Sequence, residues 1–405
     1  MRLLRHFSFA VAIVLNACAG EENGNAGAGA RVDTLPGGIP RIIASSPADS
    51  GRWHLAVARN IQPPELDSAE LGNPRDIALA DDGTLFVSDA NPTVIKVFDR
   101  NGQLIRLLGR EGEGPGEFRE PYIAVAGDTL IAQDPAIGRA TSFNWRTGQM
   151  LTERRTACCY FGSIGIDASN RAAVRMMTQP DSTLPNVQAF VRFQASGTAA
   201  DTVRIPSGSR KASTPQWVLR RGNQVFMTLL VPYQPRAFHV VDPGGSFLTA
   251  FSSDYSLVRT TTGLDSTAVF GRIRTSIPIS ADEKSRIAER RVEEVFRDNE
   301  QEISKSTIRA GFDPSLIPDA RPAFEGVWVD RAARTWVQVG TRDTSVVQLD
   351  LFDRDGRWLD AITVPAASWL RSPYRPAAFA SEEIAVAIEG EDGRPLVRIF
   401  RVERR

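Results

Sequence analysis

The sequence contains few of the residues on which most metal, redox and nucleic-acid sites depend. Its 405 residues include 3 Cys, 3 His and 4 Lys, and the 48 basic residues are balanced by 48 acidic ones. Without an excess of positive charge the chain has little means of displacing counterions from nucleic acid, so we expect no nucleic-acid partner. Three histidines, one of them at position 6, leave too few for a His-rich metal centre and argue against a Ser–His–Asp triad.

Long hydrophobic runs are also absent, and the one apolar stretch near the start is short. Arg2 and Arg5 precede the apolar segment 7–15, which is too short to span a bilayer. This combination predicts a cleaved export signal over residues 1–17. The signal ends in Leu15-Asn16-Ala17-Cys18, which resembles the bacterial lipobox, and the resemblance implies that Cys18 becomes the lipidated first residue. The alternative is an ordinary secretory signal with an incidental cysteine.

Residues 19–30 are small, polar and rich in glycine, as in a flexible tether. We therefore predict a lipidated cysteine and tether over 18–50 and a folded part over 51–405. The expected address is the bacterial cell envelope, with the membrane as a partner through the N-terminal lipid, at the outer membrane or the periplasmic face.

The two remaining cysteines, Cys158 and Cys159, are adjacent in the sequence. In an oxidising compartment they are candidates for a vicinal disulfide, and the alternatives are two buried thiols or a redox pair.

A repeated pattern indicates the fold. The segment Phe98-Asp99-Arg100-Asn101-Gly102 recurs as Phe352-Asp353-Arg354-Asp355-Gly356, with weaker copies between them. The repeat glycines stand at 102, 148, 197, 245 and 356, at intervals of 46, 49, 48 and 111 residues. Glycine permits the positive φ that a tight hairpin requires. A period near 48 residues is typical of β-propellers.

One complete unit begins at Pro74. Strands are predicted over 77–80, 84–88, 94–98 and 104–108, with a polar turn after the first of them. Four short strands joined by turns form one propeller blade.

The two ends of the chain predict how the ring closes. A last unit has strands over 384–388 and 396–402, and the chain stops where its fourth strand is needed. Residues 55–58 have the pattern of the missing strand. Because such pairing leaves no open sheet edge, we predict an all-β, six-bladed β-propeller closed by its termini.

An insertion is predicted over residues 256–321, before the penultimate blade. Ser280 and Glu283 form a capping box, and apolar residues follow at helical spacing, so we expect a helix over about 281–305. The helix is expected to pack across the propeller; the alternative is that it covers the channel mouth or meets a partner.

The stretch 72–151 resembles propellers of the NHL-repeat type. The matching residues are Pro74, the run from Asp82 to Asp89, Val97-Phe98-Asp99, Gly109, the run from Gly114 to Phe118, and Pro121. With its leader and helical insertion, the chain is similar to bacterial six-bladed β-propeller lipoproteins of the NHL-repeat-like or TolB-like kind. The resemblance implies the fold, whereas propellers serve as binding scaffolds, lactonases and lyases alike.

The first strand of each blade lines the central channel of a propeller, so residues that open these strands are candidates for a site at the channel mouth. They are Arg75, Asp76, Tyr122, Ser163, Trp217 and Phe324. Asp89 and Asp134 end the second strands of two successive units, where they either bind turn backbone or contribute to a ligand site at the mouth.

No catalytic set is recognisable in the sequence. We therefore expect a binding or scaffold module without catalysis, whose ligand is a protein, a peptide or a glycan. The alternative is a calcium-dependent hydrolase of the lactonase type, because oxygen-rich coordination suits Ca²⁺ and Asp76, Asp89 and Asp134 offer carboxylates. No other cofactor is predicted.

Overall fold

The computed structural model describes residues 29–65, 67–155, 160–166, 172–177, 188–193, 199–204, 215–243, 245–260, 266–299, 303–369 and 376–405. The predictions for Cys18, Cys158 and Cys159 lie outside the described residues, as does the predicted export signal.

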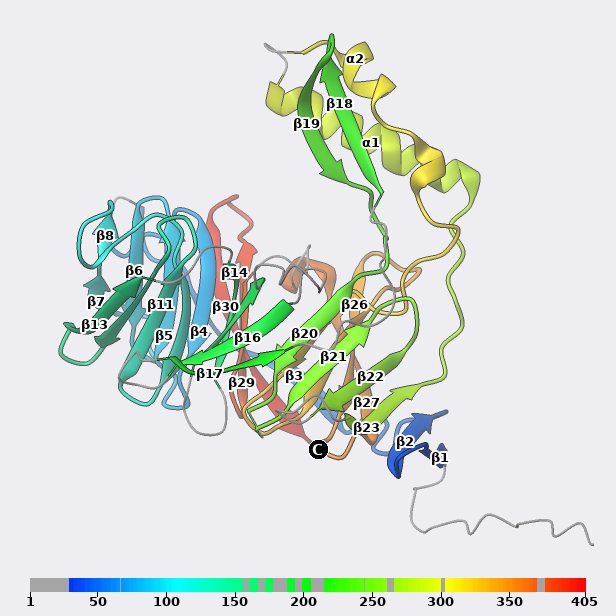
Figure 1. The fold of residues 1–405 in the computed structure, drawn as a ribbon, viewed down its shortest axis with the longest axis horizontal. Coiled ribbons are helices and arrows are strands. Elements are labelled where there is room, and N and C mark those ends of the chain that lie inside the picture. Colours follow the sequence, from blue (N-terminus) through cyan, green and yellow to red (C-terminus); the bar gives the residue numbers. More distant parts are fainter. Residues whose placement is uncertain are drawn as a thin grey trace, which may run out of the picture.

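The chain forms a ring of six blades, each an antiparallel four-stranded sheet at its core (Figure 1). The first blade contains β4 (Pro74–Leu79), β5 (Leu85–Ala90), β6 (Thr93–Phe98) and β7 (Leu104–Leu108). The second contains β10 (Tyr122–Ala126), β11 (Thr129–Asp134), β12 (Arg139–Asn144) and β13 (Gln149–Arg155). The third contains β14 (Tyr160–Ile166), β15 (Ala172–Met177), β16 (Gln188–Phe193) and β17 (Ala199–Arg204). A short parallel pair, β8 (Arg110–Glu111) and β9 (Glu117–Phe118), lies between the first two blades in sequence.

The fourth and fifth blades repeat this order. The fourth contains β20 (Ala237–Val241), β21 (Phe247–Phe251), β22 (Ser256–Thr260) and β23 (Ser266–Arg272). The fifth contains β24 (Gly326–Val329), β25 (Thr335–Val339), β26 (Val346–Phe352) and β27 (Trp358–Pro365), followed by a 3₁₀ turn, η2 (Ala366–Ser368). The predicted turn glycines Gly102, Gly148, Gly245 and Gly356 all have positive φ, which confirms their role in the hairpins.

The sixth blade joins both ends of the chain, and this confirms the predicted closure. It contains β28 (Ala377–Phe379), β29 (Glu383–Glu389), β30 (Pro395–Arg404) and the N-terminal strand β3 (Trp53–Ile61). β3 pairs antiparallel with β30, with Trp53 opposite Arg404 and Ile61 opposite Val397. The six-bladed propeller predicted from the repeat is therefore the fold of this chain.

Two strands occupy the segment that the sequence analysis assigned to a tether. β1 (Ala30–Leu35) and β2 (Ile39–Ala44) form a hairpin, and β2 continues the fourth blade by pairing parallel with β23. The tether prediction over 18–50 was therefore too long. The reason is packing: Ala44 is buried, and Ile42 contacts the apolar cluster between the fourth and fifth blades.

A small unit stands apart from the ring in Figure 1; we call it the side unit. It combines the hairpin β18 (Gln216–Arg221) and β19 (Gln224–Leu230) with α1 (Ala281–Asn299), α2 (Lys305–Ala310) and η1 (Pro314–Leu316). Its hairpin is inserted before the fourth blade and its helices before the fifth. Since β22 and β23 belong to the fourth blade, the helical insertion begins after Arg272 rather than at 256.

The helix forms where its cap predicts it. The amide of Glu283 donates to Oγ of Ser280 at 3.2 Å, and α1 ends at Asn299 before α2 begins at Lys305. The expectation that this helix packs across the propeller was wrong. Its apolar stripe, including Ala288 and Val292, packs against Trp217 and Leu219 of the hairpin, so the side unit has its own core.

Candidate functional site

The first strand of every blade contributes to one central cavity of about 710 Å³. These strands are β4, β10, β14, β20, β24 and β28. Each blade repeats the same chain path, so the first residues of these strands lie at one end of the channel, here called the near mouth, and their last residues lie at the far end. A volume of this size is within the range of ligand pockets.

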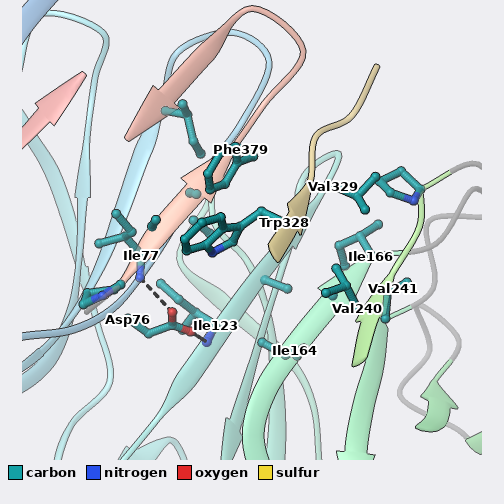
Figure 2. A pocket seen from close by; sticks show the side chains of 18 of the residues that line it. Asp76, Ile77, Ile123, Ile164, Ile166, Val240, Val241, Trp328, Val329 and Phe379 are labelled. Atoms are coloured by element: carbon teal, nitrogen blue, oxygen red, sulfur yellow. Dashed lines mark hydrogen bonds between the residues drawn. The ribbon is translucent and has the colours of Figure 1, made fainter. Parts of the chain in front are cut away.

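Most of the residues that line the channel are apolar (Figure 2), although polar groups make up nearly half of its exposed wall. Trp328 of β24 and Phe379 of β28 stack with ring centroids 5.2 Å apart and planes 21° apart, and both remain partly exposed. The other labelled apolar residues are Ile77, Ile123, Ile164, Ile166, Val240, Val241 and Val329. An apolar group entering the channel would therefore be removed from water on several sides.

A second cavity of about 510 Å³ borders the near mouth. Arg75, Tyr122 and Pro376 line both cavities. The remaining residues of the second cavity come from the ends of β29 and β30 and from the start of the first blade: Asn73, Pro74, Ala387, Ile388, Glu389, Gly393 and Pro395. The two cavities are therefore neighbours that share three residues in their walls.

Arg75 is the basic residue where the two cavities meet. Its side chain is 26% exposed, and Nη1 lies 3.5 Å from Oε1 of Glu120, whose side chain is 47% exposed. The Nε of Arg75 is buried and has no hydrogen-bond partner in the described part of the chain. The guanidinium therefore keeps donors that protein groups do not use.

Asp76 follows Arg75 and is half-buried in the channel wall. Oδ1 accepts from the amide of Ile77 at 3.0 Å, and Oδ2 accepts from the amide of Ile123 at 2.8 Å, as the dashed lines in Figure 2 show. The carboxylate thus links the first strands of two neighbouring blades. Burial raises the pKa of Asp76 to about 7, and the two backbone hydrogen bonds oppose this rise.

At the far end, side chains from several blades meet. Nη1 of Arg331 lies 3.1 Å from Oδ2 of Asp81, and Nη2 of Arg331 donates to the carbonyl oxygen of Val125 at 3.0 Å. Oγ of Ser381 lies 3.5 Å from Oδ1 of Asp81. These contacts join the fifth, first, second and sixth blades across the end of the channel.

The structure brings three of the sequence-predicted site residues together. Arg75, Asp76 and Tyr122 all line the channel, and Arg75 and Tyr122 also line the second cavity. Ser163 lies on β14, and its side chain is outside the described part of the structure. Trp328 and Phe379 were not among the predicted site residues. Each is the third residue of a short first strand, and this shared position is the signal in the sequence that could have identified them.

The predicted positions of Trp217 and Phe324 at the channel mouth need correction. Trp217 lies on β18 in the side unit, where it is buried against Phe312 and its indole nitrogen donates to the carbonyl of Asp313 at 2.9 Å. Phe324 precedes β24 and is fully buried beside Phe238 and Tyr255, in the cluster between the fourth and fifth blades. Both side chains are therefore core residues: Trp217 packs in the side unit and Phe324 packs between two blades, so neither faces the channel.

Asp89 and Asp134 are also displaced from the predicted mouth. Asp89 is fully buried and accepts from the amides of Gly72 at 2.8 Å and Asn73 at 2.6 Å, and from Nζ of Lys96 at 2.8 Å.

Asp134 is equally buried and accepts from the amides of Arg119 at 2.6 Å and Glu120 at 2.9 Å. Each aspartate therefore fixes the loop that leads into the first strand of its blade, and so positions Arg75 and Tyr122.

The three carboxylates proposed as calcium ligands are not gathered at one place. Asp76 lines the channel, whereas Asp89 and Asp134 each hold backbone amides within their own blades. Among the residues that the structure describes, no group of three or more His, Cys, Asp and Glu side chains is arranged to hold a metal ion. Nor does any helix in this part of the chain combine the length and apolar character that crossing a bilayer requires.

Comparisons with known proteins agree with the architecture. A family model described as a 6-bladed beta-propeller matches residues 66–161. No curated protein matches the chain. A solved Bacteroides fragilis structure, described as a "Putative exported protein", has 13% sequence identity and a TM-score of 0.51, and the match covers 90% of this chain and 99% of that chain.

Two further solved structures match over most of their length. A member of the duf4221 family from Bacteroides vulgatus has 11% identity and a TM-score of 0.49, with 88% of this chain and 100% of that chain covered. The catalytically inactive virginiamycin B lyase from Staphylococcus aureus has 10% identity and a TM-score of 0.43, with 86% and 99% covered. At these identities the likeness of solved structures concerns the fold alone, and it is the Bacteroides fragilis structure that supports it.

Proposed function

We propose that this chain is an exported, lipid-anchored propeller that binds a protein, peptide or glycan ligand through the near mouth of its channel, without catalysis. The observation that carries this proposal is the channel itself, which is about 710 Å³ in volume and borders a second cavity at one end. At the other end Arg331 and Asp81 bridge the blades. Ligand pockets commonly combine such an apolar wall with a few polar groups at the entrance.

The polar groups of the channel suit binding. Both carboxylate oxygens of Asp76 already accept backbone amides, so this side chain holds two blades together. Arg331 and Asp81 are paired with each other. The side chain of Arg75 is 26% exposed and forms only a long ion pair with Glu120, so its Nη groups can donate to a ligand at the entrance.

The experiment compares a variant that fills the channel with a control variant that carries the same substitution on the surface. Val240 lines the channel, and Val240→Trp places an indole there; Val225 is 54% exposed on β19, so Val225→Trp is the matched control. The mature protein and both variants are screened by thermal melting against peptides and oligosaccharides. A ligand that binds the native state raises Tm, and we expect the rise in the mature protein and in Val225→Trp but not in Val240→Trp. An equal rise in a cooperatively folded Val240→Trp contradicts the proposal.

The anchoring part of the proposal depends on Cys18. Cys18→Ser removes the thiol that the lipobox resemblance marks for lipidation, and we expect the variant to leave the membrane fraction of the host cell. Immunoblots of membrane and released fractions measure this. A Cys18→Ser protein that still sediments with membranes in full contradicts lipid anchoring, whatever the channel binds.

A further inference from the structure

Arg75 occupies a position from which it reaches ligands in both cavities. It lines the central channel and the second cavity, together with Tyr122 and Pro376. A group bound at Arg75 can therefore extend in two directions, into the apolar channel and outward along the second cavity.

The guanidinium of Arg75 has bonding capacity left over. Arginine offers five N–H donors, whereas the ion pair with Glu120 is long, at 3.5 Å, and involves a carboxylate that is about half exposed. Its Nε is buried and therefore out of reach of a ligand, whereas the side chain as a whole is 26% exposed, so Nη1 and Nη2 are the donor groups open to a ligand. A planar oxyanion in two-pronged contact with Nη1 and Nη2 would use these donors.

The surrounding charges permit an anion at this place. Arg236 also lines the channel and adds a second positive charge. Glu120 is the acidic residue that forms an ion pair with Arg75. Asp76 stands beside it, but burial raises its pKa to about 7, so near neutrality this carboxyl carries only part of a negative charge. Glu389 is exposed and lines the second cavity but not the channel.

The two cavities differ in what they accommodate. The channel wall beyond Arg75 includes Ile77 and the stacked pair Trp328 and Phe379, which suits one apolar group. The second cavity, of about 510 Å³, is lined by Pro74, Pro376 and Pro395 among others and offers space for the preceding residues of a chain.

We propose that the near mouth binds a peptide C-terminus: its carboxylate pairs with Arg75, its last apolar side chain enters the channel, and its preceding residues lie in the second cavity. This inference depends on the proposed binding function and specifies its ligand. A fatty carboxylate presents the same chemistry, an apolar group next to an oxyanion, but leaves the second cavity empty. The second cavity, which shares Arg75 with the channel, favours the peptide.

The test uses calorimetric titration of the mature protein. The probes are acetylated tetrapeptides Ac-Gly-Gly-Gly-Xaa, with Leu, Ile, Val or Phe at the end, each as the free acid and as the C-terminal amide, and octanoate. We expect at least one free acid to bind and its amide to bind at least tenfold more weakly. Arg75→Gln should lower the affinity for the acid at least tenfold and abolish the preference for acid over amide, and Arg75→Lys should restore part of that preference.

Arg401→Gln is the matched control. Arg401 forms a comparable long ion pair with Glu403, at 3.7 Å, on β30 away from both cavities, so its affinity should stay within about twofold of the parent. Equal binding of acid and amide, or full affinity in Arg75→Gln, overturns the proposal.

The remaining outcomes are also decisive. Arg75-dependent binding of octanoate without any peptide binding assigns the site to fatty carboxylates and overturns the peptide proposal. If none of the probes binds while another ligand is lost only in Val240→Trp, the carboxylate site is wrong and the channel function stands. If no probe binds and no ligand is lost in Val240→Trp, both the carboxylate site and the channel function are wrong.

Discussion

Arg331 and Asp81 meet across the far end of the channel, with Nη1 and Oδ2 3.1 Å apart, although 250 residues separate them in the sequence. They belong to the fifth and first blades, which face each other only because the ring is closed. Arg331 also donates to the carbonyl of Val125 in the second blade. The pair therefore links ring closure to the shape of the channel, which is bridged at one end and bordered by a second cavity at the other.

Replacing Arg331 should cost little stability. The Asp81 side chain is 60% exposed, so solvent screens the ion pair, and such pairs contribute up to about 1 kcal/mol. For Arg331→Met we expect the free energy of unfolding, from urea titrations, to fall by roughly 1 kcal/mol, including the hydrogen bond to Val125. A loss several times larger would show that this contact holds the ring together, contrary to our account.

Asp76 predicts a pH dependence of stability. Its pKa rises from 3.8 to about 7 on burial, so the folded chain retains this proton in a range where the unfolded chain has lost it. The free energy of unfolding therefore falls as pH rises from about 4 to about 7, and this contribution is constant above that range.

Asp76→Asn removes this titration. Because an amide oxygen replaces only one of two acceptors, the variant should be about 1 kcal/mol less stable than the parent at pH 4.5, and this difference should shrink as pH rises and the parent loses stability. Urea titrations at pH 4.5, 6 and 8 should show a smaller decline for the variant than for the parent. Parallel declines in the two proteins contradict the assignment.

Closure of the ring rests on β3. Ile61 is 2% exposed in the cluster shared by the first and sixth blades, whereas Val57 on the same strand is 54% exposed. We expect Ile61→Ala to lower the free energy of unfolding by about 2–4 kcal/mol, because it leaves a cavity. Val57→Ala is the matched control and should stay within about 0.5 kcal/mol of the parent. Similar small losses for both would mean that β3 does not close the core.

The side unit should be dispensable for the ring. Its core includes Trp217, Val292, Ile308 and Phe312, and none of the residues in that cluster belongs to a blade. Replacing residues 215–231 and 279–319 by short Gly-Ser linkers should leave a cooperatively melting β-protein, which circular dichroism measures. Loss of the cooperative transition contradicts a separable unit.

The sequence predicts the ring better than the site. The recurrence of Phe98–Gly102 as Phe352–Gly356 identifies the blades because every hairpin needs the same turn, and residues 55–58 identify the closing strand because the last blade lacks one. Trp217 was wrongly predicted to lie at the channel mouth. Buried and exposed residues alternate in β18 as they do in a first strand of a blade, so the sequence pattern does not distinguish the two.

The site depends on relations that a linear pattern does not contain. Trp328 and Phe379 meet because two short strands from different blades converge on the channel, and Arg331 reaches Asp81 only across the closed ring. Asp89 and Asp134 stand at equivalent positions, yet whether such a carboxylate faces a ligand or backbone amides is decided by the loop packed on it.

The most direct test of the central claim uses ¹⁹F NMR of the protein labelled with 5-fluorotryptophan. The chain has 7 Trp, and Trp328→Phe identifies the resonance of the channel tryptophan. Upon addition of a ligand found by thermal melting, the account predicts a shift of the Trp328 resonance and none for Trp217 in the side unit. A ligand that shifts Trp217 and leaves Trp328 unchanged would contradict binding in the channel.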